Sequence, residues 1–285
     1  MSTAATHKLL PAFPTLLKVT MDEFEFAKHV AGLGGEILAS HYARGIDVQH
    51  KGAVDLVTQA DLETEQVIAD AIVKQFPGHA VLGEESHSAA VDSEHLWIID
   101  PLDGTTNFAH HIPHFAVSVA YYRSGEPVCG VVYNPVHNDW YTSQRGSGAF
   151  ENGERMQVTA AKSLNDVCIG CGFFYDRGAA MELTLHAIRD LFQQHIRGIR
   201  RMGTASLDLC YVANGSFGAF FEFELKPWDF AAGQLFVTEA GGRITTCGGT
   251  DVPTGRTSML ATNGHLHDSV LQIVAPHWNS LSESD

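Results

Sequence analysis

Two acids, a glycine and two hydroxyl residues follow an apolar run in the segment Trp97–Thr106. Asp100 and Asp103 offer hard oxygen ligands of the kind that Mg²⁺ prefers. Gly104 begins a turn, and the two threonines after it could present backbone N–H groups and hydroxyls to a phosphate. Carboxylates beside such a turn indicate metal-assisted phosphoryl chemistry. Taken alone, the segment could also be an acidic surface turn.

Two further acidic segments favour the metal-site interpretation. Glu84 follows the short apolar run Ala80–Leu82, which predicts another strand. Asp229 comes soon after Pro227, which suits the first turn of a helix, so Asp229 would lie near the positive end of that helix. An acid between two aromatic residues is expected to be partly buried and to need a cation or hydrogen-bond donors. Together with the two central acids, these residues would suffice for a two-metal site.

Hydrophobic periodicity predicts the elements that must position these acids. The expected helices cover 24–42, with Asp22 as a cap, 58–76, 181–194, 205–213, 228–240 and 265–274. The expected strands cover 80–82, 97–99, 115–121, 128–133, 140–143, 167–170 and 217–223. Strands and helices in blocks indicate layered α/β packing. We divide the chain into an N-terminal arm at 1–20, an N-terminal α/β half at 21–156 with the metal and phosphate motifs, and a C-terminal α/β half at 157–285 that completes the site.

These motifs, in this order, resemble the inositol monophosphatase family. The matching pieces run from about 21 to about 275 and are Asp55–Thr58 with Asp61, Gly83–Ser86, Trp97–Phe108, Gly203–Ala205, Trp228–Asp229 and Glu239–Gly242. The runs at 113–120 and 226–233 look most like the bacterial inositol-1-monophosphatase branch. The resemblance implies an α-β-α-β-α sandwich of the inositol monophosphatase and fructose-1,6-bisphosphatase type, with the metal site between the two sheet regions.

The resemblance also implies a role for each candidate residue. The metal ligands would be Glu84, Asp100, the carbonyl of Leu102, Asp103 and Asp229. The catalytic residues would be Asp55, Thr105 and Glu84, with Asp55 and Thr105 aligning the attacking water. The substrate would contact Asp103, Gly104, Thr105, Thr106, Ala205, Glu222 and Asp229, with Glu222 accepting a ring hydroxyl.

Three of these acids have a simpler interpretation as well. Asp55 could be a strand-end cap, and Glu222 could be a surface acid. Asp61 could order the network around the attacking water or only begin its helix.

The expected function is a Mg²⁺-dependent phosphomonoesterase that acts on inositol monophosphate or similar polyol phosphates. The resemblance further implies inhibition by Li⁺ and a homodimer. Related phosphatases of 3′-phosphoadenosine, histidinol phosphate or fructose bisphosphate could share every metal ligand. Some bacterial relatives also bind transcription machinery, so an interaction protein is an alternative of a different class.

Composition limits the partners and the compartment. The formal net charge of −15 disfavours direct nucleic-acid binding and anionic membranes, and no apolar run is long enough to span a bilayer. Five scattered cysteines and no recognisable signal peptide fit a reducing cytoplasm. The C-x-x-C at Cys168–Cys171 is expected to be buried thiols rather than a redox or zinc pair. His110, His111 and His114 are expected on a surface loop.

Overall fold

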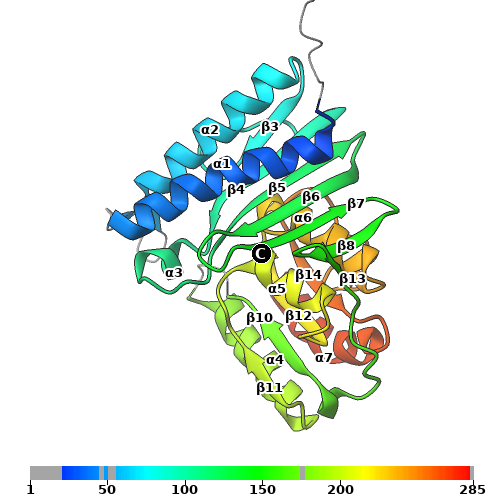
Figure 1. Cartoon of the computed structure of the whole chain (residues 1–285). Helices are drawn as coiled ribbons and strands as arrows, with labels where there is room; N and C mark the ends of the chain where they lie inside the picture. The colour runs from blue at the N-terminus through cyan, green and yellow to red at the C-terminus, as the bar shows by residue number, and fades with distance from the viewer. Residues whose placement is uncertain (1–20, 45–47, 51–55, 174–176, 283–285) are drawn as a thin grey trace, which may run out of the picture.

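The computed structural model describes residues 21–44, 48–50, 56–173 and 177–282; the expected arm at 1–20 and Asp55 lie outside them. The described elements form five layers (Figure 1). Two helices cover the outer face of a seven-stranded sheet, two more lie between this sheet and a five-stranded one, and a last pair covers the far face of the second sheet. This order confirms the expected α-β-α-β-α sandwich.

The first sheet has the strand order β3-β4-β5-β6-β7-β8-β9. Its strands are β3 (Ala80–Gly83), β4 (His95–Asp103), β5 (Ala116–Arg123), β6 (Glu126–Asn134), β7 (Asp139–Gln144), β8 (Gly148–Glu151) and β9 (Glu154–Arg155). β3 and β4 are parallel, and every later pair is antiparallel. Alternate residues of β4 enter different cores, Trp97 on one face and Ile98 on the other, because helices cover both faces. The strand therefore reads as a continuous apolar run.

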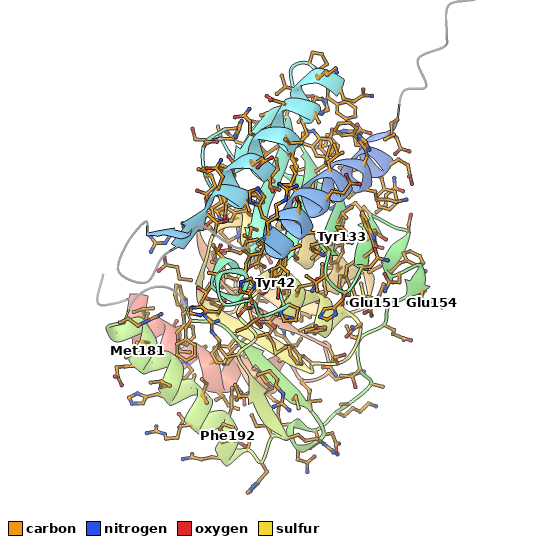
Figure 2. All side chains as sticks on the ribbon, turned by 60° about the vertical axis from the view of Figure 1, so that its left-hand side comes forward. Tyr42, Tyr133, Glu151, Glu154, Met181 and Phe192 are labelled. Carbon is orange, nitrogen blue, oxygen red and sulfur yellow. The ribbon has the colours of Figure 1, made fainter. Side chains whose placement is uncertain are left out.

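The outer face of this sheet is covered by α1 (Glu23–Arg44) and α2 (Gln59–Gln75). Asp22 caps α1 as expected, since its Oδ1 accepts a hydrogen bond from Glu25 N at 2.8 Å. At the other end of α1, Tyr42 (labelled in Figure 2) packs against two aromatic rings. Its ring centroid lies 5.6 Å from that of Phe108 and 5.1 Å from that of Phe115. These contacts join α1 to the segment that follows β4.

The second sheet has the strand order β11-β10-β12-β14-β13. Its strands are β10 (Cys168–Cys171), β11 (Gly198–Arg200), β12 (Ala219–Leu225), β13 (Arg243–Thr245) and β14 (Thr257–Thr262), and its outer face is covered by α4 (Ala179–Gln193) and α7 (His267–Ser282). The remaining elements are the pair β1 (Val48–His50) and β2 (Leu56–Thr58), the short helix α3 (Thr105–Ala109) and the 3₁₀ turn η1 (Leu164–Asp166).

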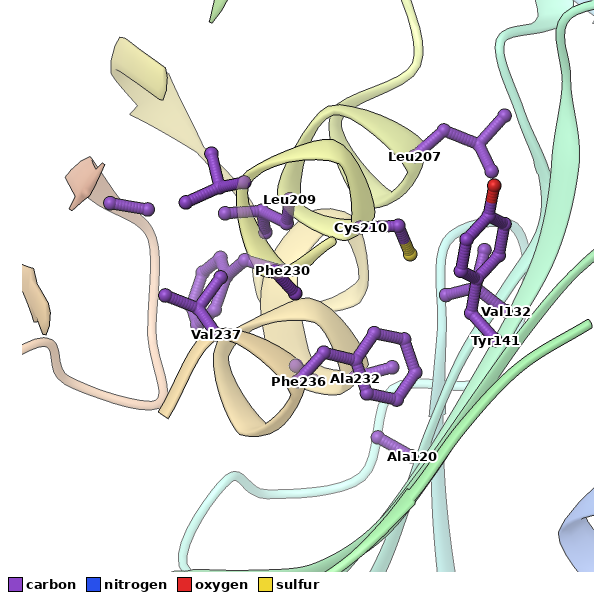
Figure 3. Packing of buried hydrophobic residues seen from close by; sticks show 14 of the residues in the cluster. Ala120, Val132, Tyr141, Leu207, Leu209, Cys210, Phe230, Ala232, Phe236 and Val237 are labelled. Carbon is purple, nitrogen blue, oxygen red and sulfur yellow. The ribbon is translucent and has the colours of Figure 1, made fainter. Parts of the chain in front are cut away.

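The central layer consists of α5 (Ala205–Ala213) and α6 (Pro227–Glu239). Its largest cluster contains Leu207 and Phe236 from these helices and Tyr141 from the first sheet, all almost fully buried (Figure 3). Small residues allow close approach: a Cβ on Gly130 of β6 would lie 3.0 Å from the Cα of Ala232. One continuous core therefore joins the two sheets.

The last helix differs from its expected end at 274, since α7 runs to Ser282 and includes Pro276. The continuation brings Trp278 and Leu281 against the core of the second sheet. This burial outweighs the hydrogen bond that proline cannot donate within a helix. No helix in the described ranges is long and apolar enough to cross a membrane.

Candidate active site

The ends of two parallel strands bring the first acids together. Glu84 directly follows β3, while Asp100 and Asp103 lie at the end of its parallel neighbour β4, so all three reach the same edge of the sheet. The register of β4 against β5 shifts between Asp100 and Asp103. Such an irregularity re-aims side chains at a strand end. Gly104 then turns the chain into α3 with a φ of +93°, a conformation that favours glycine.

Two helix N-termini from the central layer face the same edge. Asp103 Oδ2 accepts a hydrogen bond from Ser206 N, in the first turn of α5, at 2.7 Å. Asp229 lies in the first turn of α6, behind Pro227, and its Oδ2 accepts from Lys226 N at 2.6 Å. Helix N-termini favour negative charge, which helps to keep both carboxylates in place.

Most of the predicted site residues line a single cavity. It is lined by Glu84, Asp103, Gly104, Thr105, Thr106, Ala205, Glu222 and Asp229, together with residues that the sequence did not single out. Glu222 comes from β12 of the second sheet and is 8% exposed. Its simpler interpretation as a surface acid is therefore wrong.

Two predicted ligands lie beneath the wall of this cavity. Asp100 and Leu102 are almost fully buried, and Asp100 Oδ1 accepts a hydrogen bond from Leu102 N at 3.0 Å. The carboxyl of Asp100 still interacts electrostatically with Glu84, Asp103 and Asp229. Asp55 lies outside the described residues, and its role stays a prediction.

The buried acids of the site lie close to one another, and their carboxyl groups have raised pKa values. Burial raises the pKa of Asp103 to about 6, against the hydrogen bonds from Ser206 that lower it. Burial and the nearby Asp103 raise the pKa of Asp229 to about 7. The pKa of Asp100 is raised well above its ordinary value by burial and by three neighbouring acids. Crowded carboxylates in a low-dielectric site favour either protons or a cation among them.

The donor set fits Mg²⁺ in its chemistry. All the candidate donors are carboxylate or carbonyl oxygens, which suit a hard divalent cation, and the described residues place no thiolate or imidazole among the cavity-lining groups. Within the same described ranges, no three acidic, histidine or cysteine side chains form a ready-made coordination sphere. Mutual repulsion among like charges disfavours such convergence in the protein alone.

Thr105 connects this site to the start of α2. Its Oγ1 lies 3.1 Å from the carbonyl oxygen of Leu102 and 3.3 Å from Asp61 Oδ1, and its single proton can be donated to only one of them at a time. The other oxygen of Asp61 accepts hydrogen bonds from Thr58, in the capping box of α2. Asp61 therefore begins its helix and also contacts Thr105. Burial raises the pKa of Asp61 to about 6.

A buried acid that sequence reasoning missed supports the loop of Glu84. Glu65 lies on α2 and is fully buried, and its carboxylate accepts hydrogen bonds from Glu85 N, Ser86 N, Ser86 Oγ and His87 N. The ring Nδ1 of His87 also lies 2.8 Å away. Burial raises the pKa of Glu65, but these bonds outweigh it and lower the pKa overall. The helical spacing of Glu65 gave no sign of this role.

Asn107 is a second connection that the sequence did not reveal. Its Nδ2 lies 2.7 Å from the carbonyl oxygen of His114, 2.9 Å from that of Met202 and 3.3 Å from Thr204 Oγ1. The amide therefore joins the helix after the central motif to the loop before α5. The sequence signals for it were its position directly after Thr106 and its place in the Trp97–Phe108 motif.

Other residues also differ from expectation. His110 and His111 are exposed, but His114 is half-buried, and burial lowers its pKa to about 4.

Sequence reasoning did not assign Arg201, Asp208 or Lys226 to the site, although all three line the cavity. The free cysteines include Cys171, which is buried, and Cys168, which is partly buried; both lie on β10.

Comparison with known proteins agrees with this arrangement. The model of the inositol monophosphatase family matches residues 21–279. An inositol-1-monophosphatase from Rhizobium meliloti is 42% identical over 252 residues, which cover 88% of this chain and 92% of the relative. A protein from Pseudomonas aeruginosa named Nus factor SuhB is 42% identical over 237 residues, which cover 81% of this chain and 87% of the relative.

Solved structures give the same result. An IMPase from Thermotoga maritima superposes with a TM-score of 0.83 at 35% identity, covering 92% of this chain and all of the other. An IMPase/NADP phosphatase in complex with Mg²⁺ and phosphate superposes with a TM-score of 0.77 at 29% identity, covering 87% of this chain and 94% of that one. The fold, the order of the acidic motifs and these matches over most of the chain lead to one conclusion: the protein belongs to the inositol monophosphatase family.

Proposed function

We propose that this chain hydrolyses inositol monophosphate, or a similar polyol phosphate, to the alcohol and inorganic phosphate in a reaction that requires Mg²⁺. The observation that carries the proposal is the meeting of four acids from two parallel strands and a helix N-terminus. Glu84, Asp103 and Asp229 line the cavity, and the buried Asp100 interacts electrostatically with all three. The relatives named inositol-1-monophosphatase and the solved Mg²⁺ complex support it.

Each element would contribute one part of the chemistry. Magnesium held by these four acids and the Leu102 carbonyl would supply charge neutralisation and an acidified water. The backbone N–H groups that follow Gly104 would hold the phosphate. Thr105, with Asp55 and Glu84, would orient the attacking water.

The alcohol end of the substrate would lie toward the second sheet. Glu222, from β12, would accept a hydroxyl of the leaving alcohol, and the backbone of Ala205 would contact its ring. Residues far apart in the sequence would thus have different tasks. The acids at the strand ends of the first sheet would serve the hydrolysis, and Glu222 of the second sheet would recognise the alcohol. The division of the chain at 156/157 is part of this proposal.

A phosphate-release assay tests the function. Purified protein with Mg²⁺ is expected to hydrolyse inositol 1-phosphate, and EDTA is expected to stop the reaction. Asp103→Asn is expected to abolish turnover, while Asp92→Asn, which removes an exposed acid from a loop away from the cavity, should leave it unchanged. Full activity of Asp103→Asn, or of EDTA-treated protein, would rule out the metal assignment.

Finer features of the proposal need their own measurements. We infer Li⁺ inhibition, a homodimer and a cytoplasmic location from the family. Millimolar Li⁺ in the same assay, sedimentation of the purified chain and cell fractionation test the three in turn.

A role with transcription machinery is a second candidate, favoured by the relative named Nus factor SuhB. Such a role would survive Asp103→Asn, whereas hydrolysis would not. Complementation by this variant in a strain that lacks the gene would therefore separate the two functions.

A further inference from the structure

A groove of about 530 Å³ lies along the last two turns of α6, at the end of this helix that is opposite Asp229. Its other walls come from the start of β6, the residue after β7, and the segment from β13 to the loop before β14. The proposed reaction uses none of these residues. The apolar side chains that line the groove are Pro127, Leu235, Ile244 and Val252.

The groove is also acidic. Among its described lining residues, Glu126, Glu239 and Asp251 face a single cation, Arg145, which already pairs with Glu126. Glu239 accepts hydrogen bonds from two backbone N–H groups of the loop after β7. The last turn of α6 contains no basic residue, although the partial negative charge of a helix C-terminus favours one. A basic and apolar ligand would therefore complement this groove.

The segment at 1–20 combines these two properties. It contains Lys8, Lys18 and no acid, so the formal net charge of −15 is the sum of +2 from this segment and −17 from the rest of the chain. Between the two lysines, the run Leu9–Leu17 contains four leucines and one phenylalanine. Removing such side chains from water is favourable, and the positive segment is attracted to the acidic remainder.

The start of α1 lies close to the rim of the groove. Glu23 Oε1 pairs with Arg123 Nη2 at 2.8 Å. Arg123 is the register partner of Glu126 across the hairpin between β5 and β6, and Glu126 lines the groove. Because α1 and α6 pack on opposite faces of the first sheet, the segment would have to pass this hairpin (Figure 1). About six extended residues span roughly 20 Å, so residues 8–14 can reach the groove.

Covalent attachment makes a weak contact sufficient. A segment that is tied by a short flexible chain has an effective concentration in the millimolar range at a site that it can reach. A free partner at a lower concentration would need a tighter contact to occupy the same groove.

A second groove, between α1 and α2, is less suited to a basic segment. Its acids, Glu36 and Glu63, are accompanied by His41 and Arg44 in the same walls. His41 Nε2 also lies 2.8 Å from Glu63 Oε2. The groove at the end of α6 therefore has the larger excess of negative charge.

We propose that residues 8–14 of the chain's own N-terminal segment dock in the groove at the C-terminal end of α6. Leu9, Leu10 and Phe13 contact its apolar wall, and Lys8 faces its acids. The docking takes place within one chain and does not depend on catalysis, so it stands or falls separately from the proposed function.

Photo-crosslinking of the full chain tests the docking. Phe13 is replaced by p-benzoylphenylalanine, which keeps an aromatic ring, and the irradiated protein is digested and mapped by mass spectrometry. Phe192, which is exposed on α4, receives the same replacement as a control. Electrophoresis separates crosslinks within one chain from crosslinks between two chains, which double the mass. Thermal melting of each protein checks folding.

We expect crosslinks from position 13, within one chain, to peptides that contain the groove residues at 126–127, 234–239 or 244–252. Position 192 should give none of them. Asp251→Lys, which reverses an exposed charge of the groove, should lower their yield roughly three- to tenfold. Asp92→Lys makes the same reversal on a loop outside the groove and should leave the yield unchanged. Added salt should lower the yield in the wild type.

Four results would overturn the proposal. Crosslinks confined to the groove between α1 and α2 would place the segment there instead. Products of doubled mass would assign the groove to the segment of a second copy. A complete lack of groove crosslinks would mean that the segment does not dock, and equal losses in Asp251→Lys and Asp92→Lys would mean that the groove acids do not attract it.

Discussion

At the scale of single residues, carboxylates that line the same cavity have different surroundings and different proposed roles. Glu222 is buried in the middle of β12 in the second sheet, while Asp103 lies at the end of β4 and is held by a helix N-terminus. We expect Glu222→Gln to raise KM for inositol 1-phosphate about ten- to a hundredfold, because one hydrogen bond to a charged acceptor is worth roughly 1.5–3 kcal/mol. A small ester without ring hydroxyls should be almost unaffected.

The check is a comparison of both substrates in one assay. Thr105→Ala serves as the contrasting variant, because it should lower kcat for both substrates alike. Proportional losses on the two esters in Glu222→Gln would show that this acid does not select the alcohol.

At the scale of elements, the loop of Glu84 depends on a residue of α2. Glu65→Gln keeps the shape but replaces one acceptor oxygen with a donor amide, which faces N–H groups of the loop at 85–87. Unsatisfied buried donors cost about 1–3 kcal/mol each, so urea unfolding should show a loss of that order or more. Turnover should fall as well, because the loop positions Glu84.

The matched control is Glu63→Gln on the same helix, where the acid is exposed and its carboxylate pairs with His41. Its stability should change by less than about 0.5 kcal/mol. If Glu65→Gln were equally harmless, the loop would not depend on this carboxylate.

The first residue of α7, the helix on the outer face of the second sheet, is a buried histidine. His267 is fully buried, with its two ring nitrogens 3.1 and 3.0 Å from the hydroxyls of Thr245 and Thr262. Burial lowers its pKa to about 4. The unfolded chain binds a proton near pH 6.5 and the folded chain does not, so the free energy of unfolding should fall as pH drops from 6.5 toward 4, by up to about 3 kcal/mol.

Urea unfolding at pH 7 and pH 4.5 measures this fall in the free energy of unfolding. His267→Gln should lose less stability between the two pH values than the wild type does. His265→Gln, two residues earlier and exposed, should behave as the wild type. Equal pH dependence in all three proteins would mean that His267 is not held neutral.

Sequence patterns predicted most of these elements because each long helix and strand has its own apolar period. The strand that carries Asp100 and Asp103, and the helix that carries Asp229, were placed within a few residues. Strands of only two or three residues, such as β9 and β11, were missed because so few residues give no period. Glu65 and Asn107 were missed for another reason: their partners are distant in sequence, and a local pattern contains no information about them.

At the scale of the whole molecule, the first sheet and the central helices meet at a cluster of like charges. Metal that binds only the folded chain stabilises it by about 2.7 kcal/mol when its concentration is a hundredfold above the dissociation constant. We expect Mg²⁺ to raise the melting temperature of the wild type, compared with NaCl at the same ionic strength. Asp103→Asn should lose most of this increase, and its melting temperature without metal should equal or exceed that of the wild type, because one repulsive charge is gone.

The central layer of α5 and α6 has a consequence for a chain that is cut. Both helices follow the connection after β9 in sequence, yet much of their apolar surface is covered by the sheet that precedes it. A protease that cleaved this connection would leave one fragment with Asp100 and Asp103 and another with Glu222 and Asp229. Each fragment alone would expose a wide apolar face, so the two would remain associated in native buffer and separate only in denaturant. Enzymatic activity would then report reassembly of the two fragments.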